Sequence, residues 1–392
     1  MDYNPFSPEV WENPYPYYAE LRHHNPVYEV PGVGLWAISR YDDVYTVLRT
    51  PQVFSSAALA SASLGDLSPW QPEAPPMISS DPPYHTRLRK LVNRAFTPRR
   101  VASLEAHIRE MVQRLSAPLA TQDEFDLVRD LAVPLPVMAI AELLGVPPER
   151  YPDFKRWVSD LVVATTAAFT PEAQERIRQS IAEWRAYFQD AIAGYHKKPG
   201  DNLLSDMVRA EEENQTLNDE EILSQAIIIL IGGVETTTNL IGNAMLALFD
   251  HPEQMAMMRA NLGLVPNLVE ETLRYEPPVV GLLRQATQDI TLSGTTLPTG
   301  AIVMFLLGSA NHDERKFPDP ERFDLMRNTE GHLGFGYGIH FCLGAQLARL
   351  EAKVTLETLL GQFPRLARTD APIPRVQSPF VRGVQTLPLV VG

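Results

Sequence analysis

The chain of 392 residues is 45 % hydrophobic and 21 % charged, a composition typical of a globular protein with a large core. Its formal net charge of -14 disfavours phosphate backbones and anionic lipid surfaces, so nucleic acid is not an expected partner. The single cysteine excludes an internal disulfide and a metal cluster held by cysteines alone.

The N-terminus predicts a cytoplasmic protein without a membrane anchor. Residues 1–6 are polar and contain proline, unlike the charged and apolar regions of a signal peptide. The longest apolar run, residues 226–234, has nine residues. Because a bilayer-spanning helix needs roughly 20 apolar residues, this run indicates a buried helix instead.

Short β-strands are expected in two places. Residues 27–30 and 35–38 flank a turn with two glycines and predict a hairpin, and residues 286–304 form a second β-rich zone with turns at 293–294 and 298–300. Most of the remaining chain has helical spacing, and no clean boundary divides it. We therefore expect one mainly α domain with minor β structure over residues 1–392. The segment 55–80 lacks periodicity and predicts a long loop that is either disordered or functional.

A helix is predicted just after Asp81, which would cap its N-terminus, with proline in the first turn. His85 and Arg89 are four residues apart and therefore lie on one face of this helix, beside an apolar stripe. As isolated residues, both would be interpreted as exposed basic side chains.

A longer helix is predicted to begin near Asn218, which forms a capping box with Glu221. It contains the adjacent glycines Gly232 and Gly233, each of which costs a helix roughly 1 kcal/mol relative to alanine. Such a cost indicates a compensating role, although the following Glu235 and Thr236 are also common on helix surfaces.

Glu271 and Arg274 are three residues apart on a predicted helix, so their side chains can pair. An isolated pair of this kind is usually a solvated surface bridge.

The most informative segment surrounds the cysteine, from Phe335 to Gly344. Glycines at 336, 338 and 344 allow tight turns and a close approach to a flat group. Leucines then recur at helical spacing, so Cys342 precedes a helix N-terminus, where the dipole favours a thiolate. A lone cysteine can equally be a small core residue, but that interpretation leaves the glycines unexplained.

This segment resembles the haem-binding loop of the cytochrome P450 family, matching its Phe-Gly-x-Gly-x-His-x-Cys-x-Gly pattern at every fixed position. The resemblance implies the P450 fold, with a long central helix over the haem and small β-sheets. It also implies that Cys342 is the axial thiolate of haem b, that Phe335 packs beneath the porphyrin, that His340 reaches a propionate, and that Gly344 closes the cofactor-binding loop.

The other motifs match the same family in its order. The match implies that His85, Arg89 and Arg284 bind the propionates. The glycine pair would open a local distortion in the central helix, where Glu235 and Thr236 deliver protons during dioxygen activation. Glu271 and Arg274 would form a buried structural cluster, with Arg322 as the third member.

Family position also implies contacts to a lipophilic substrate such as a terpenoid, steroid, fatty acyl chain or macrolide. The segments expected to supply them are 55–80 and 162–169. The single residues are Ile229, Gly232, Gly233, Val279, Val280, Leu282 and Leu283.

The expected activity is that of a monooxygenase, which hydroxylates or epoxidises its substrate with one oxygen atom of O2. Since no flavin or iron-sulfur segment follows the haem domain, NAD(P)H would act only indirectly, through a ferredoxin or flavodoxin and its reductase. Lys90, Arg94 and Arg349 would dock that partner on a monomeric protein.

Three alternatives remain open. A haem-thiolate sensor or carrier would not need Glu235 and Thr236. A haem-free protein that uses Cys342 as a nucleophile or redox switch would not need the cationic residues. Within the family, a peroxygenase or a C-C coupling enzyme is a further possibility.

Overall fold

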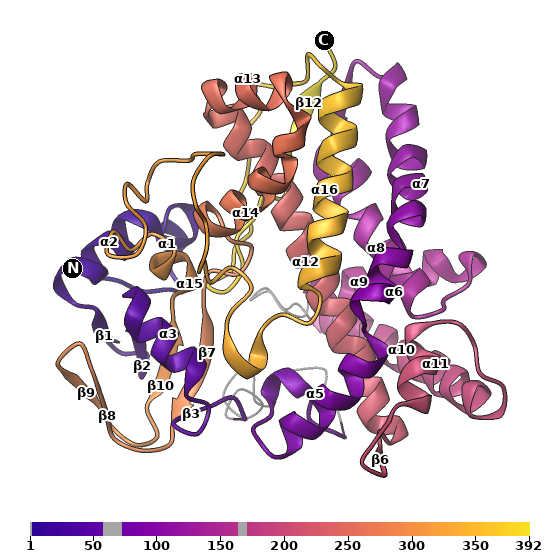
Figure 1. Ribbon diagram of the computed structural model, residues 1–392, viewed down its shortest axis with the longest axis horizontal. Helices are drawn as coiled ribbons and strands as arrows, with labels where there is room; N and C mark the ends of the chain where they lie inside the picture. Colours follow the sequence, from indigo (N-terminus) through magenta and orange to yellow (C-terminus); the bar gives the residue numbers. More distant parts are fainter. Residues whose placement is uncertain (1, 58–72, 164–170) are drawn as a thin grey trace. The chain divides into compact units, whose positions relative to one another are not determined.

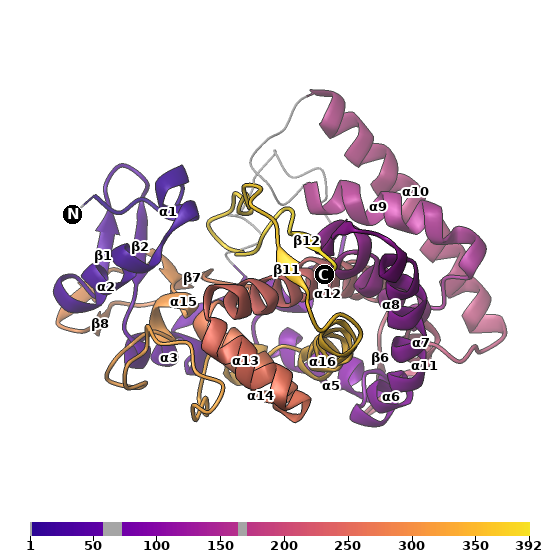
Figure 2. The ribbon, with the colours of Figure 1, turned by 90° about the horizontal axis from the view of Figure 1, so that it is seen from above.

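The computed structural model describes residues 2–57, 73–163 and 171–392. Helices dominate and the sheets are small, so the predicted fold class is confirmed (Figures 1 and 2). Parts of the two expected substrate segments, residues 58–72 and 164–169, lie outside the described residues.

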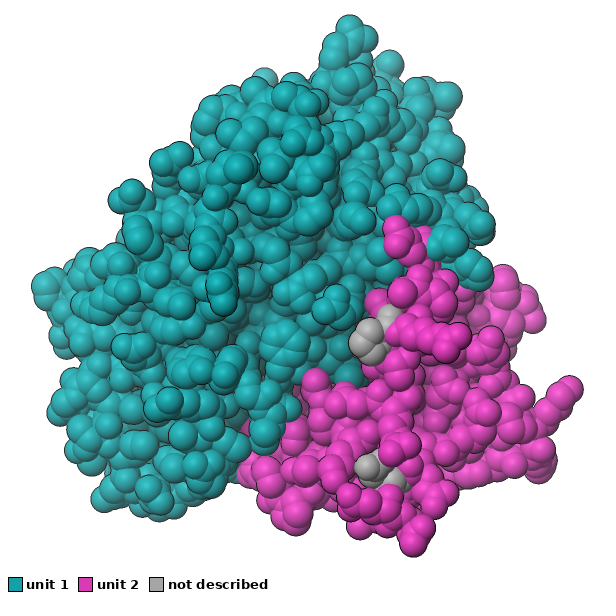
Figure 3. Space-filling model, in the orientation of Figure 1, with its two compact units in different colours: residues 1–55, 106–135, 236–392 teal, residues 56–105, 136–235 magenta. Residues whose placement is uncertain are grey.

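The chain forms two compact units, which Figure 3 colours separately. Unit 1 comprises residues 1–55, 106–135 and 236–392, and unit 2 comprises residues 56–105 and 136–235. The helices of unit 1 are α1 (Pro8–Glu12), α2 (Tyr15–His24), α3 (Tyr41–Arg49), α7 (Glu105–Ser116), η3 (Ala117–Thr121), η4 (Val128–Ala132), α13 (Pro252–Ala260), η6 (Leu262–Leu264), α14 (Val265–Tyr275), α15 (Leu307–Ala310), η7 (Gly338–His340) and α16 (Ala345–Gln362).

The main sheet of unit 1 has the strand order β1-β2-β10-β7-β3. The strands are β1 (Val27–Val30), β2 (Leu35–Ile38), β3 (Phe54–Ser55), β7 (Leu282–Ala286) and β10 (Ile302–Phe305). β10 pairs parallel with β2 and antiparallel with β7, while β1 and β2 form the predicted hairpin. The second predicted β zone is also confirmed, since β8 (Ile290–Leu292) and β9 (Thr295–Leu297) pair across a turn where Ser293 and Gly294 have positive φ.

The helical core of unit 1 lies where α14 packs against α16 (Figure 2). Leu268 of α14 and Leu356 of α16 are fully buried in one hydrophobic cluster. The same cluster contains Leu389 of β12 (Pro388–Val390), which pairs with β4 (Glu124–Asp126) and β11 (Ala367–Arg368). A large apolar core therefore supports the segment that precedes α16.

Unit 2 is built from α5 (Tyr84–Ala95), α6 (Pro98–Ser103), α8 (Pro134–Leu143), α9 (Tyr151–Val163), α10 (Pro171–Lys197), α11 (Leu203–Arg209), the short helices η2 (Met77–Ser79) and η5 (Pro148–Arg150), and the hairpin β5 (Glu211–Glu212) and β6 (Gln215–Thr216). α9 packs along α10, and the Ser180 hydroxyl donates to Asp160 over 2.6 Å between them.

The predicted cap of α5 is wrong. The helix begins at Tyr84, its N-cap is Pro83, and no side chain caps it. Asp81 instead accepts a hydrogen bond from the backbone N–H of Ser56 at 2.8 Å, so its carboxylate orders the preceding segment.

The long helix α12 (Asp219–Asp250) begins with the predicted capping box. Asn218 Oδ1 accepts from the Glu221 N–H at 2.9 Å, and Glu221 Oε2 accepts from the Asn218 N–H at 3.0 Å. Its length and composition would suffice to cross a membrane, but 61 % of its most apolar window is buried in the protein. This burial is typical of a central core helix.

Candidate functional site

The cysteine loop ends at the N-terminus of α16, whose N-cap is Gly344. The Cys342 N–H donates to the carbonyl of Phe335 at 3.0 Å, and the Phe341 N–H donates to that of Gly338 at 3.1 Å. These bonds fold the loop back on itself and leave the thiol just before the helix. Because the N-terminal end of a helix carries partial positive charge, this position favours a thiolate.

Glycines make the turns of this loop possible. Gly336 and Gly338 have φ values of 70° and 71°, in the left-handed region that L side chains rarely adopt. A Cβ on Gly338 would also lie 2.7 Å from the carbonyl oxygen of Leu48 in α3. The ring centroids of Tyr337 in the loop and Tyr45 in α3 are 4.5 Å apart. The glycine pattern therefore serves loop packing as well as tight turning.

The predicted Glu-Arg pair is buried and bidentate. Arg274 donates from Nε and Nη2 to the two carboxylate oxygens of Glu271, each at 2.8 Å. It also donates to the carbonyl oxygens of Asn311 and Pro320. A buried pair with its remaining hydrogen bonds satisfied is a structural element, as predicted.

The prediction that Arg322 completes this cluster is wrong. Its side chain is 66 % exposed and pairs with Asp324, so only its backbone carbonyl reaches the cluster. Arg327 is the third member, because its side chain is 10 % exposed and its Nε lies 3.3 Å from Glu271 Oε1. Both arginines belong to an irregular segment, where sequence spacing does not fix side-chain direction.

Asn311 connects the cluster with the cysteine loop, and no motif in the sequence predicted this role. Its Oδ1 accepts from the Leu333 N–H at 2.7 Å, and its Nδ2 donates to the Leu273 carbonyl at 3.2 Å. Its own carbonyl accepts from Arg274 at 3.1 Å. One fully buried amide thus joins α14 to the start of the loop.

A second network lies beside Phe335. Arg349 of α16 donates to both carboxylate oxygens of Glu270, at 2.6 and 2.9 Å, and its guanidinium lies 4.5 Å from the centre of the Phe335 ring. The Gly334 N–H donates to Nδ1 of His332, which leaves Nε2 to donate to Glu270. Burial alone would raise the pKa of Glu270, but the bonds from Arg349 and His332 hold that pKa at about 2.

These contacts change the interpretation of Arg349. It was expected to be a docking cation, but its charge is neutralised by Glu270 and its side chain stacks on Phe335. Its contribution is to the shape of the cysteine loop.

Strand β7 places the predicted Arg284 in a buried position. Its guanidinium lies 5.3 Å from the centre of the Phe305 ring, and it donates to the Leu283 carbonyl at 2.7 Å. Because side chains alternate along a strand, Leu282 shares the face of Arg284, while Leu283 points to the other face. Leu282 and Val279 accordingly pack beside one hydrophobic cluster of the unit.

Val280 and Leu283 have other contacts within unit 1, and their role as pocket residues stays a prediction. Leu283 packs against the N-terminal cluster that includes Tyr3 and Tyr18. Val280 is buried, and its Cγ1 is 3.4 Å from where a Cβ on Gly308 would lie. Alternation along β7 places Leu282 and Leu283 on opposite faces, whereas Val279 and Val280 precede the strand.

Val381 lies opposite Val279, a position that no motif in the sequence marked. It forms an antiparallel bridge with Val279, and directly opposed residues of such a pair carry their side chains on the same face. No periodic pattern marks the segment 375–384, which explains why it was missed.

In unit 2, His85 is buried and Arg89 is half-buried on the same face of α5. Leu88 and Leu91, which are fully buried, anchor the helix next to them. The structure therefore gives the two residues the shared face that their spacing predicted.

The glycines of α12 differ from one another. A Cβ on Gly232 would meet nothing within 4 Å, whereas one on Gly233 would lie 2.8 Å from Cδ1 of Ile140 in α8. Gly233 thus permits close packing of α12 against α8, and its role as a pocket residue stays a prediction. The helix is continuous through this region, so the predicted distortion does not interrupt it.

Glu235 follows the glycines as a partly buried carboxyl. Burial raises its pKa to about 7, so that it holds a proton over much of the neutral range. This property suits a group that stores and releases protons near neutral pH.

The residues present fit a haem. In unit 1, a thiol lies at a helix N-terminus, the Arg284 guanidinium is buried on β7, and a Cβ added to Gly344 would meet nothing within 4 Å. Among the described residues no group of His, Cys, Asp and Glu could hold a bare metal ion. A single thiolate is instead the ligand that a porphyrin-bound iron requires of the protein.

Comparison with known proteins supports this interpretation over nearly the whole chain. Residues 11–388 match the family Cytochrome P450. Vitamin D(3) 25-hydroxylase of Pseudonocardia autotrophica is 40 % identical over 396 residues, covering 99 % of this chain and 96 % of that protein. The structure of cytochrome P450 CYP109Q5 from Chondromyces apiculatus has a TM-score of 0.93 at 43 % identity, covering 99 % and 98 %. That of CYP109E1 from Bacillus megaterium in complex with testosterone has a TM-score of 0.88 at 35 % identity, covering 97 % and 99 %.

The corrected cluster predicts different effects for two arginines. Arg327→Ala should lower the free energy of unfolding by about 1–3 kcal/mol, because a buried carboxylate loses a partner. Arg322→Ala should change it by less than about 0.5 kcal/mol, as for an ordinary surface residue. Urea unfolding of both variants measures the difference, and equal losses would contradict the assignment of Arg327.

The loop geometry predicts that Gly338→Ala costs more than Gly32→Ala. Both glycines have positive φ, but only a Cβ at 338 meets a backbone oxygen. Gly32→Ala should lose about 1–2 kcal/mol from left-handed strain alone, and Gly338→Ala should lose more. Thermal unfolding compares them, and an equal loss would show that the contact with Leu48 is relieved without cost.

Proposed function

Because the chain belongs to the cytochrome P450 family, we propose that the Cys342 thiolate is the axial ligand of a haem b iron. As a member of this family the protein is a monooxygenase of lipophilic substrates, which uses haem, dioxygen and electrons that NAD(P)H supplies through redox partners. The observation that carries the role of Cys342 is its position, in a loop with two left-handed glycines immediately before α16.

The bound haem supplies an iron that activates dioxygen, and a thiolate ligand favours O–O cleavage by donating electron density. The protein contributes the geometry of the thiolate. The hydrogen bond from the Cys342 N–H to Phe335 and the stacking of Arg349 on the Phe335 ring hold the loop in place. Gly344, as the N-cap of α16, keeps the helix end free of a side chain that would crowd the cofactor.

We propose that the predicted cationic residues bind the haem propionates. Arg284 is buried on β7, and its charge suits an anionic carboxylate. We propose the same role for His85 and Arg89 of α5 and for His340 of η7, because each occupies the corresponding position of a family motif. Several cationic or hydrogen-bonding partners are needed because two carboxylates are taken out of water.

Glu235 and Thr236 are the proposed proton-delivery groups. Burial raises the pKa of the Glu235 carboxyl to about 7, so that a large fraction of it is protonated near neutral pH. Thr236 is the next residue of α12, and its Oγ1 can accept that proton and pass its own toward the reacting oxygen. This pair favours use of dioxygen over a peroxide-driven reaction.

The residues proposed to contact substrate are the predicted Ile229, Gly232, Gly233, Val279, Val280, Leu282 and Leu283, with Val381, the bridge partner of Val279, as an addition. All are apolar or lack a side chain, which suits a lipophilic molecule. Relatives named for vitamin D(3) hydroxylation and crystallised with testosterone support a terpenoid or steroid, while fatty acyl chains and macrolides remain in the same class.

The electron donor is proposed to be a ferredoxin or flavodoxin served by its reductase, and residues 1–392 to act as one monomeric, cytoplasmic haem domain. Lys90 and Arg94 of α5 are the remaining candidate docking cations on a chain with a net charge of -14. Lys90 lies 3.2 Å from the exposed Glu213, a contact that a docking acidic partner could replace.

The ligation proposal predicts a spectroscopic signature. The dithionite-reduced protein exposed to carbon monoxide should show a strongly red-shifted Soret band, because carbon monoxide binds opposite a thiolate. Cys342→Ser should lose that band. Absence of any haem band in the unmodified protein would overturn the proposed function.

The proton-delivery proposal predicts a pH dependence. Coupling of electron consumption to product should fall as the pH rises through about 7, since Glu235 then loses the proton that it donates. Glu235→Gln should be poorly coupled and should no longer show this transition, and Thr236→Ala should be uncoupled at every pH. Full coupling in Thr236→Ala would contradict the role of its hydroxyl.

A further inference from the structure

A second buried charge cluster of unit 1 lies at the C-terminal end of α14. Glu276 is the C-cap of that helix, and both Arg382 and Arg375 form ion pairs with it. Glu276 and Arg382 are buried. Burial would raise the pKa of Glu276, but the two arginines hold that pKa below its ordinary value, so the carboxyl stays ionised.

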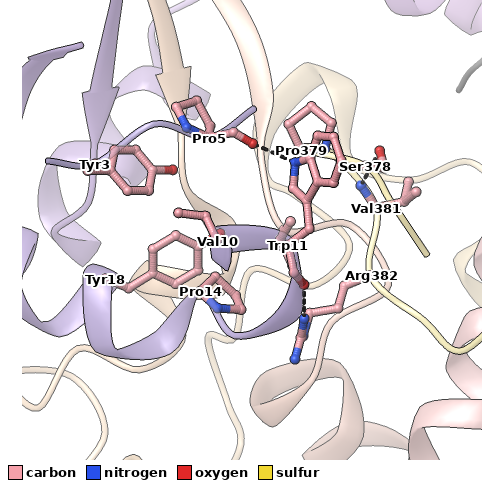
Figure 4. A pocket seen from close by; sticks show the side chains of 11 residues that line it. Tyr3, Pro5, Val10, Trp11, Pro14, Tyr18, Ser378, Pro379, Val381 and Arg382 are labelled. Carbon is pink, nitrogen blue, oxygen red and sulfur yellow. Dashed lines mark hydrogen bonds between the residues drawn. The ribbon is translucent and has the colours of Figure 1, made fainter. Parts of the chain in front are cut away.

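Three parts of the chain, far apart in sequence, meet at this cluster. Arg382 donates from Nη1 to the carbonyl oxygen of Trp11 at 2.8 Å (Figure 4). The hydroxyl of Tyr15 donates to Glu276 Oε2 at 3.0 Å. Asn243 of α12 donates from Nδ2 to the carbonyl oxygens of both Glu276 and Arg382, at 3.0 Å each. The cluster therefore joins the N-terminal segment, the central helix and the C-terminal segment to the end of α14.

Directly beside the cluster, two irregular segments pair with each other. The Arg382 N–H donates to the Pro278 carbonyl, and the Val280 N–H donates to the Phe380 carbonyl, both at 2.8 Å. Between these bonds lies the bridge from Val279 to Val381. Pro277 and Pro278 have no N–H group, so this stretch has fewer backbone donors than an ordinary strand. Side-chain contacts must therefore help to hold these two segments in place.

We propose that the Glu276–Arg382 pair is a positioning element of the substrate site, which fixes the spacing of Val279 and Val381 and thereby the length of lipophilic substrate accepted. This inference rests on the proposed function of those valines as substrate walls. Arg382 is suited to the task because its planar guanidinium reaches the carboxylate and the carbonyl oxygens of Trp11 and Glu12 at once. A lysine has one ammonium and cannot keep all of these contacts.

The test uses the holoenzyme and a series of 1-alkylimidazoles, from imidazole to dodecylimidazole, followed by the shift of the haem spectrum. Imidazole itself reports an intact haem, whereas the gain in affinity with chain length reports the apolar walls. In Arg382→Lys the dissociation constant for imidazole should change less than about twofold. The gain in affinity from imidazole to dodecylimidazole should be smaller by a factor of about ten, equivalent to roughly two buried methylene groups.

Tyr15→Phe is the milder variant and should lose about threefold of that gain, because Glu276 keeps both arginines. Leu389→Ala is the control for a general loss of stability, since Leu389 is fully buried in β12, in a hydrophobic cluster that contains neither Val279 nor Val381. It should lower the melting temperature and keep the chain-length gain. Hydrogen exchange of the Val280 and Arg382 amides should accelerate in Arg382→Lys and stay unchanged in Leu389→Ala.

An unchanged chain-length gain in both Arg382→Lys and Tyr15→Phe, with normal imidazole binding, would overturn the inference alone. An equal loss in Leu389→Ala would also overturn it, because the effect would then reflect stability. A wild-type protein that gives no shift with imidazole would overturn the proposed function itself.

Discussion

The structure depends on holding one thiolate in place with a loop that has no regular secondary structure. Such a loop cannot rely on ladder hydrogen bonds, so its position comes from buried side chains. Arg274 is fixed by Glu271, it binds the carbonyl of Asn311, and the Asn311 amide binds Leu333 at the start of the loop. From the other side Arg349, fixed by Glu270, stacks on Phe335. The adjacent residues Glu270 and Glu271 of α14 therefore brace the loop from two directions.

Helix α14 has the same role for the substrate walls through Glu276. Glu270 and Glu271 of the helix and Glu276 at its C-cap are each paired with arginine. The arginines that bind Glu271 and Glu276 also donate to backbone carbonyls. Isolated buried charges would be strongly destabilising, but a planar guanidinium that satisfies a carboxylate and several carbonyls at once offsets much of the desolvation cost. Glu270 and Glu271 of α14 thus orient the cofactor loop, and Glu276 at the C-terminal end of this helix orients the segment 278–283.

Sequence patterns predicted what depends on local periodicity and motif order. The hairpin β1–β2, the capping box of α12 and the shared face of His85 and Arg89 follow from spacing along one element. The pattern could not predict which arginine of the irregular segment 318–327 turns inward, so Arg322 was chosen in place of Arg327. It also treated residues 279–283 as one surface, although alternation along β7 turns Leu283 toward the N-terminal cluster and Leu282 toward another. Asn311 and Val381 were missed because their partners are distant in sequence.

A raised carboxyl pKa is by itself a poor guide to chemistry in this chain. Burial raises the pKa of Glu351 to about 8, higher than that of Glu235, yet Glu351 lies in α16 next to the fully buried Ala352 and Thr355. Its carboxyl is a buried core group, 1 % exposed. Glu235 differs in its neighbours, because it follows Gly232, whose side borders open space, and precedes Thr236 with its exchangeable hydroxyl proton. Proton delivery therefore rests on where the carboxyl lies and on what can receive its proton, while burial only keeps the proton available near neutral pH.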